Sequence, residues 1–220
     1  MRLFKSRKLL AVISALLVLS MAVGFSACKG RKDSNETTSS TEPTTEPSMT
    51  AQELANAIIP AVVKTDMATV MSYSFVDVDK AFEDKISDKG MDRTAVYKDL
   101  TKSLGTEISC YTDFLKKQAE IQEDALKIQF GEDYKITYEI IEDNVCTPEE
   151  KEEKILNILA KLEKGGFSSA RYFDPSKAEE FREIDFDYTI EGSKNKQSSA
   201  KIITLCKYDG KWVYGDIEMM

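Results

Sequence analysis

The sequence predicts an α+β fold in which helices come first and are followed by a strand, a helix and three more strands. Two changes of pattern support this order. Apolar residues recur every three or four positions through much of residues 50–128, and from residue 134 they alternate with polar residues. The first spacing is typical of helices and the second of half-buried strands. A helical stretch over residues 148–164 then separates the first strand from the others. We therefore expect one antiparallel sheet with helices packed on one face.

The first helix is expected to begin after Thr50, because Thr50 and Glu53 have the spacing of a capping box. Its apolar positions follow at helical spacing: Leu54, Ile58 and Val62. Pro60 lacks a backbone donor, so it is expected to kink or divide this helix. Further helices are predicted at three places: after Thr65–Asp66, over residues 91–104 and over residues 111–128. Residues 76–90 show no single period, and Gly90 is expected to end them.

The second half of the chain has the clearer alternation. Residues 134–140 predict the first strand. Thr147 and Glu150 again have the spacing of a capping box, with Pro148 at the first helical position. Three further strands are predicted: residues 183–191, 199–208 and 211–217. Asp209–Gly210 is expected to form the tight turn between the last two.

The N-terminus has the features of an export signal. Four basic residues (Arg2, Lys5, Arg7 and Lys8) precede 19 uncharged, mostly apolar residues at positions 9–27. Ser26-Ala27-Cys28 resembles the lipobox of bacterial lipoproteins, with Phe25 where that family usually has leucine. The resemblance implies a signal peptide over residues 1–27, a lipid on the sulfur of Cys28, and attachment to the extracellular face of the cell membrane. A retained membrane helix and a freely secreted chain are the alternatives.

The segment after Cys28 is expected to be a disordered tether. Residues 33–49 are almost entirely serine, threonine, glutamate and proline. Such a composition buries too little apolar surface to offset the entropy lost on ordering. A flexible tether over residues 29–49 would span about 25 Å on average. The sequence thus predicts three parts: a signal over 1–27, a lipidated cysteine and tether over 28–49, and one extracellular domain over 50–220.

Composition excludes several classes of function. The chain has a formal charge of −8. Loss of the signal would leave 26 basic and 38 acidic residues, which argues against binding to nucleic acid. The chain has no histidine, so Ser-His-Asp catalysis, Cys-His catalysis and histidine metal sites are excluded. Three cysteines besides Cys28 lack CxxC spacing and are expected to be buried free thiols: Cys110, Cys146 and Cys206. No cofactor or metal is predicted.

Two stretches of the predicted domain resemble small extracellular domains of Gram-positive lipoproteins. They are ELANAIIPAVVKTDMATVMSY, residues 53–73, and YDGKWVYGDIEM, residues 208–219. The resemblance implies an NTF2-like or cystatin-like fold, in which a bent antiparallel sheet wraps on helices. It also implies an extracellular location. It transfers no catalytic residues to this chain.

Three short patterns suggest catalytic or metal chemistry. Asp77 and Asp79 have the spacing of the first two ligands of an EF-hand calcium loop. Such a loop needs Asp or Asn at position 81 and Gly at position 82, but this chain has Ala81 and Phe82. Residues 166–170, GFSSA, resemble the sequence of a nucleophile elbow. They follow a predicted helix, however, whereas a nucleophile elbow follows a strand. Asp185 and Asp187 share a strand face about 7 Å apart, a distance that could suit hydrolysis by two carboxylates. The first two patterns fail, and an exposed sheet face is the simpler interpretation of the third.

One aromatic set could form a binding site: Tyr134, Tyr138, Tyr188, Trp212 and Tyr214. On a bent sheet these side chains could line a concave pocket. The alternative, which we favour, is that they form the core between sheet and helices. In that case the face that Trp212 shares with Tyr214 would pack on the helix carrying Ile155 and Leu159.

The leading functional hypothesis is a non-enzymatic surface lipoprotein. Its domain would bind a small ligand or another envelope protein, and its contact with the membrane would be through the lipid anchor. The rival hypothesis is a cell-envelope hydrolase, or an accessory to an enzyme, that acts through carboxylates.

Overall fold

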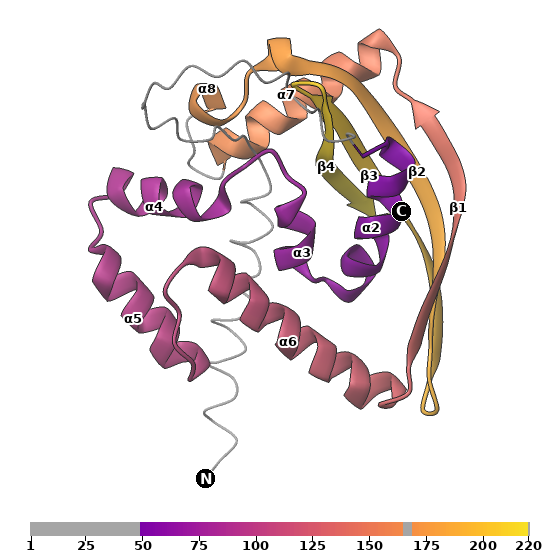
Figure 1. The fold of residues 1–220 in the computed structure, drawn as a ribbon, viewed down its shortest axis with the longest axis horizontal. Coiled ribbons are helices and arrows are strands. Elements are labelled where there is room, and N and C mark those ends of the chain that lie inside the picture. The colour runs from indigo at the N-terminus through magenta and orange to yellow at the C-terminus, as the bar shows by residue number, and fades with distance from the viewer. Residues whose placement is uncertain (1–48, 165–168, 220) are drawn as a thin grey trace, which may run out of the picture.

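The computed structural model describes residues 49–164 and 169–219. Its helices are α2 (Ala51–Lys64), α3 (Met67–Ser72), α4 (Val78–Asp88), α5 (Arg93–Leu104), α6 (Tyr111–Phe130), α7 (Pro148–Lys164), α8 (Ser169–Tyr172) and the short 3-10 helix η1 (Pro175–Lys177). Its strands are β1 (Lys135–Val145), β2 (Ala178–Glu191), β3 (Lys196–Tyr208) and β4 (Lys211–Met219). The predicted α+β class is confirmed, because helices precede an open antiparallel sheet (Figure 1).

The four strands follow one another across the sheet in the order β1-β2-β3-β4. All neighbours are antiparallel, so β1 and β4 are the two edges. The register shifts at three places, where one residue has no partner on the neighbouring strand: Ile141 in β1, Glu179 in β2 and Gly215 in β4. Bulges of this kind bend a strand and increase its twist. The long strands accordingly curve around the helices (Figure 1).

The helix starts form as the sequence predicts. Thr50 donates its backbone N–H to Glu53 at 2.7 Å, and the Glu53 N–H donates back to the Thr50 hydroxyl at 3.2 Å. Thr147 and Glu150 make the same reciprocal pair at the start of α7. Pro60 lies inside α2, which continues from Ala51 to Lys64 as one element. The alternative that Pro60 divides this helix is therefore wrong.

One core lies between α2 and the face of the sheet that we call the inner face. Leu54, Ile58 and Ile59 of α2 are fully buried, with 0% of each exposed. They share a cluster with alternate residues of β2 and β3: Ile184, Phe186, Tyr188, Ile190, Ile203 and Leu205. The apolar residues that recur every 3.6 positions in α2 thus pack against the apolar residues that alternate along β2 and β3.

A second core lies on the outer face, the side of the sheet opposite α2. Phe181 of β2 and Cys206 of β3 are directly opposite each other, are fully buried, and share a cluster with Ile158 and Leu162 of α7. The expectation that helices pack on one face is therefore wrong. Helix α7 lies beside the end of the sheet where β2 begins (Figure 1), and its contacts with Phe181 and Cys206 place it on the outer face. The physical reason is that β2 begins at Ala178 rather than at residue 183. The added residues include Phe181, whose large apolar side chain lies on the outer face.

The stretch without a clear period, residues 76–90, contains α4. Asp77 caps this helix by accepting from the Lys80 N–H at 2.9 Å. Asp79 accepts from the Thr112 N–H at 2.6 Å, so it satisfies a backbone donor in the first turn of α6. The two aspartates that began like a calcium loop thus hold helix ends, which is the commoner role of this residue type.

Candidate functional site

The predicted aromatic set does not converge on one pocket. Tyr188 and Tyr214 are buried in the inner core, with 9% and 5% exposed. Tyr138, directly opposite Tyr188, is half-buried and donates to the Asn56 side-chain carbonyl at 3.2 Å. Tyr134 lies under Lys64, whose Nζ is 5.7 Å from the ring centroid. Trp212 lines the cleft described next, and the other four aromatic residues are not part of its lining.

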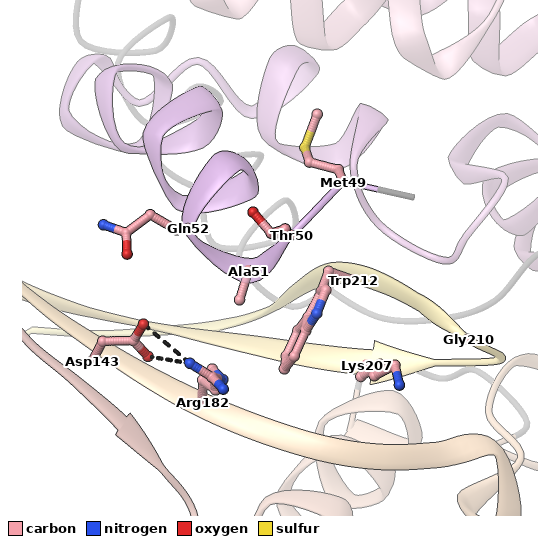
Figure 2. Close-up of a pocket in the computed structure, with 9 residues that line it drawn as sticks. All are labelled: Met49, Thr50, Ala51, Gln52, Asp143, Arg182, Lys207, Gly210 and Trp212. Atoms are coloured by element: carbon pink, nitrogen blue, oxygen red, sulfur yellow. Dashed lines mark hydrogen bonds and ion pairs between the residues drawn. The ribbon is translucent and has the colours of Figure 1, made fainter. Parts of the chain in front are cut away.

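The Trp212 cleft, as we name it, lies where the start of α2 meets one end of the sheet (Figure 2). Its volume is about 280 Å³. Its lining comes from four parts of the chain: Met49, Thr50, Ala51 and Gln52 before and within α2, Asp143 of β1, Arg182 of β2, and Lys207, Gly210 and Trp212 of the last hairpin. In Figure 2 the Trp212 ring projects from β4 into the space between the α2 residues and Arg182.

The hairpin turn sets the position of Trp212. Asp209 and Gly210 have positive φ angles of 51° and 79°, the geometry that a two-residue hairpin turn requires. The turn places Trp212 opposite Lys207. Trp212 and Tyr214 share the inner face, as predicted, but that face packs on α2. The expectation that it packs on the helix carrying Ile155 and Leu159 is wrong, because α7 covers the outer face.

Arg182 is held in the cleft by two carboxylates. Its Nε donates to Glu180 at 2.8 Å, and its Nη1 donates to both Asp143 carboxylate oxygens at 3.2 Å. The bond to Glu180 and the proximity of Asp143 raise the pKa of Arg182 above its usual range. The guanidinium carbon lies 5.5 Å from the centroid of the Trp212 ring, within the range of a cation–π contact. Arg182 thus packs against the indole ring of Trp212, and its positive charge is balanced by Asp143 and Glu180.

Sequence reasoning missed Asp143, Arg182 and Lys207. Arg182 lies two residues before Ile184, so it occupies an inner-face position among apolar residues. The sequence did contain a signal, because Arg182 is a charged residue where the alternation predicts an apolar one. The signal was missed because the strand was expected to begin at residue 183.

Two wider grooves lie on the helical side of the molecule. One, of about 720 Å³, runs between α3 and α6 and includes the Lys64–Glu123 ion pair at 3.0 Å. The other, of about 400 Å³, is lined by residues 106–109 and by α6. Neither contains a predicted site residue. We therefore take the Trp212 cleft as the candidate site.

The carboxylate pair lies away from these clefts. Asp185 and Asp187 are on the outer face of β2, opposite Glu142 and Glu139 of β1. Burial, followed by the charges of Glu142 and Glu183, raises the pKa of Asp185. Asp187 is exposed. Neither residue lines the Trp212 cleft or the two helical grooves.

Asp185→Asn is expected to stabilise the fold at neutral pH. Because the folded-state pKa of Asp185 is raised, ionisation is less favourable in the folded than in the unfolded chain. The resulting penalty is absent below the ordinary value of 3.8 and develops as the pH rises through the folded-state pKa. Urea denaturation of wild type and variant should therefore differ at neutral pH and converge in acid. Asp187→Asn is the matched control, and an equal gain in that variant would contradict the assignment.

The three cysteines of the described domain are free thiols, as predicted, but only Cys206 is buried, and the expectation of burial is wrong for the half-buried Cys110 and Cys146. Burial raises the pKa of Cys146 to about 11 and that of Cys206 to about 12. Both are therefore protonated at neutral pH, which disfavours a thiolate nucleophile. No group of three or more metal-binding side chains is arranged around a common point within residues 49–164 and 169–219. Cys28 and residues 166–168 of the GFSSA stretch lie outside the described residues.

Comparisons of this chain with protein-family models, with curated proteins and with solved structures find no match. Among the helices that the structure describes, none is both long enough and apolar enough to cross a membrane. The candidate site therefore rests on its own geometry.

Proposed function

We propose that the chain is a lipoprotein held at the extracellular face of the cell membrane by a lipid on Cys28, and that its domain is a non-catalytic binding module. The basic start, apolar run and Ser26-Ala27-Cys28 sequence support the anchor. The bent four-stranded sheet around α2 supports an NTF2-like or cystatin-like arrangement within the α+β class. The partner would be a small ligand or another envelope component.

One observation carries the binding function. Trp212 is the only tryptophan in the chain, and it is half-buried at the wall of a cleft, whereas Tyr188 and Tyr214 of the same face are buried. Tryptophan combines a large apolar surface with one hydrogen-bond donor, and this combination is common in binding sites. A hydrolase is less well supported, because the Asp185–Asp187 pair lies on an open face.

The anchor is tested by changing one sulfur. Wild type should incorporate labelled fatty acid and sediment with membranes, whereas Cys28→Ala should accumulate as a precursor or be released. Cys110→Ala is the matched control, because it removes a thiol of the folded domain and should keep the label. Equal labelling of wild type and Cys28→Ala would refute the lipoprotein assignment.

The binding function is tested with full-length protein as bait. Wild type should retain a component of solubilised native envelope, and Trp212→Leu should lose it while still unfolding cooperatively. Retention that does not depend on Trp212 would place the binding surface elsewhere. Recovery of the retained component in cleaved form would instead support the hydrolase.

A further inference from the structure

We infer that the Trp212 cleft binds an uncharged sugar ring of an oligosaccharide. The inference rests on the proposed binding function and names the class of ligand. It depends on three features of the cleft: its charges are already compensated, it contains an aromatic surface, and the polar groups beside that surface are planar and can both donate and accept hydrogen bonds.

Compensated charge disfavours an ionic ligand. Arg182 is paired with Asp143 and Glu180, and Lys207 is paired with Glu179 at 2.9 Å. The start of α2 would otherwise attract an anion, because helix N-termini carry free N–H groups and a partial positive charge. Here the Glu53 carboxylate already accepts from the Thr50 N–H and hydroxyl. An anionic ligand would therefore meet a carboxylate at each of the cationic groups.

The aromatic surface suits the apolar face of a sugar. A pyranose ring presents axial C–H groups on a face and hydroxyl groups around its rim. The Trp212 ring is fixed from one side by the Arg182 guanidinium at 5.5 Å and is only partly covered by the core. The C–H face of a sugar can lie against such a ring and exclude water from both surfaces.

The planar polar groups suit the rim hydroxyls. Asp143 accepts at both oxygens from one guanidinium nitrogen and keeps further lone pairs for a ligand. Within the described residues Arg182 uses only Nε and Nη1, so Nη2 can still donate. Gln52 is exposed on the opposite wall, and its amide can both donate and accept. Hydroxyls need donors and acceptors together, and these groups provide both.

The size of the cleft limits the ligand. Pockets for drug-sized molecules measure about 300–1,000 Å³. At about 280 Å³ the Trp212 cleft is suited to one ring, with neighbouring rings extending into solvent. We therefore expect weak binding to each ring, with affinity in the range of about 0.1–1 mM.

The single tryptophan allows a direct test. Full-length protein is kept in a polyoxyethylene detergent, because glycoside detergents would compete for the cleft. Selective excitation of Trp212 then follows a titration with the trimer of N-acetylglucosamine. A saturable change in emission is expected. Inorganic phosphate and a polyglutamate peptide at equal concentration should produce none, and a saturable response to either would overturn the inference in favour of an anionic ligand.

A matched pair of variants locates the response. Gln52→Ala removes one hydrogen-bonding group from the wall and should weaken trimer binding about threefold to tenfold. Gln129→Ala removes another exposed glutamine, one that lies on α6 and does not line the cleft, and should leave binding unchanged. Equal affinity of wild type and Gln52→Ala, or no response to the trimer in wild type, would refute the sugar assignment. Retention of an envelope component through Trp212 would still support the proposed function in that case, so the two failures are distinguishable.

Discussion

Phe186→Ala is expected to lower the free energy of unfolding by about 3–5 kcal/mol. Phe186 is 1% exposed on the inner face, where its ring contacts that of Tyr188 and belongs to the same core cluster as the buried residues of α2. Truncation removes a large apolar surface and leaves a cavity that a sheet held by ladders on both sides cannot close. Urea denaturation measures the loss. Because total stabilities are typically about 5–15 kcal/mol, Phe186→Leu provides a milder variant that should remain folded.

Trp212→Ala is the comparison for this prediction. Its ring is half-buried, so the loss should be about 1–2 kcal/mol, close to that of an ordinary substitution. A loss as large as that of Phe186→Ala would mean that Trp212 is a core residue and would remove the main support for the candidate site.

Gly192→Ala is expected to destabilise the fold by about 2–4 kcal/mol. A Cβ at this position would lie 2.2 Å from the Phe130 carbonyl oxygen and 3.1 Å from the Tyr134 Cα, and both are backbone atoms. The β2–β3 turn would have to move away from the end of α6. It would lose the bond from the Lys194 N–H to the Phe130 carbonyl at 2.9 Å.

Gly210→Ala separates this steric effect from backbone strain. A Cβ at Gly210 meets nothing within 4 Å, but its φ of +79° is unfavourable for alanine. Its cost should be about 1 kcal/mol. Thermal unfolding of the two variants measures the difference, and equal losses would contradict the close approach of the turn to Phe130.

Local sequence signals predicted the elements because their causes are local. The Thr50 and Thr147 capping boxes, the Asp209–Gly210 turn and the alternation of residues 184–190 each depend on neighbours within a few positions. The second core is a different case. Phe181 and Arg182 reverse the apolar and polar sides of β2 where α7 begins to cover the outer face. The first residues of β2 are covered on both faces, so apolar and polar residues do not alternate there in the same way as in the rest of the strand. The sequence pattern therefore placed the start of β2 too late.

The candidate site could be predicted only in part. The alternation placed Trp212 and Tyr214 on one face, and the structure agrees. What no local pattern contains is the approach of residues 49–52 to the ends of β1, β2 and β4. That approach follows from how α2 lies across the sheet, which depends on the shape of the whole inner core. The difference between a core tryptophan and a cleft tryptophan was therefore a tertiary property.

The position of Met49 and Thr50 at the cleft has a mechanical consequence. The described chain enters the fold there, and α2 follows immediately as the buried centre of the inner core. Tension applied through the N-terminal segment would reach the first turn of α2, and hence Gln52, before any strand of the sheet. A ligand held between Gln52 and Arg182 would fasten that turn to β2, so a loaded cleft would withstand a greater pulling force than an empty one.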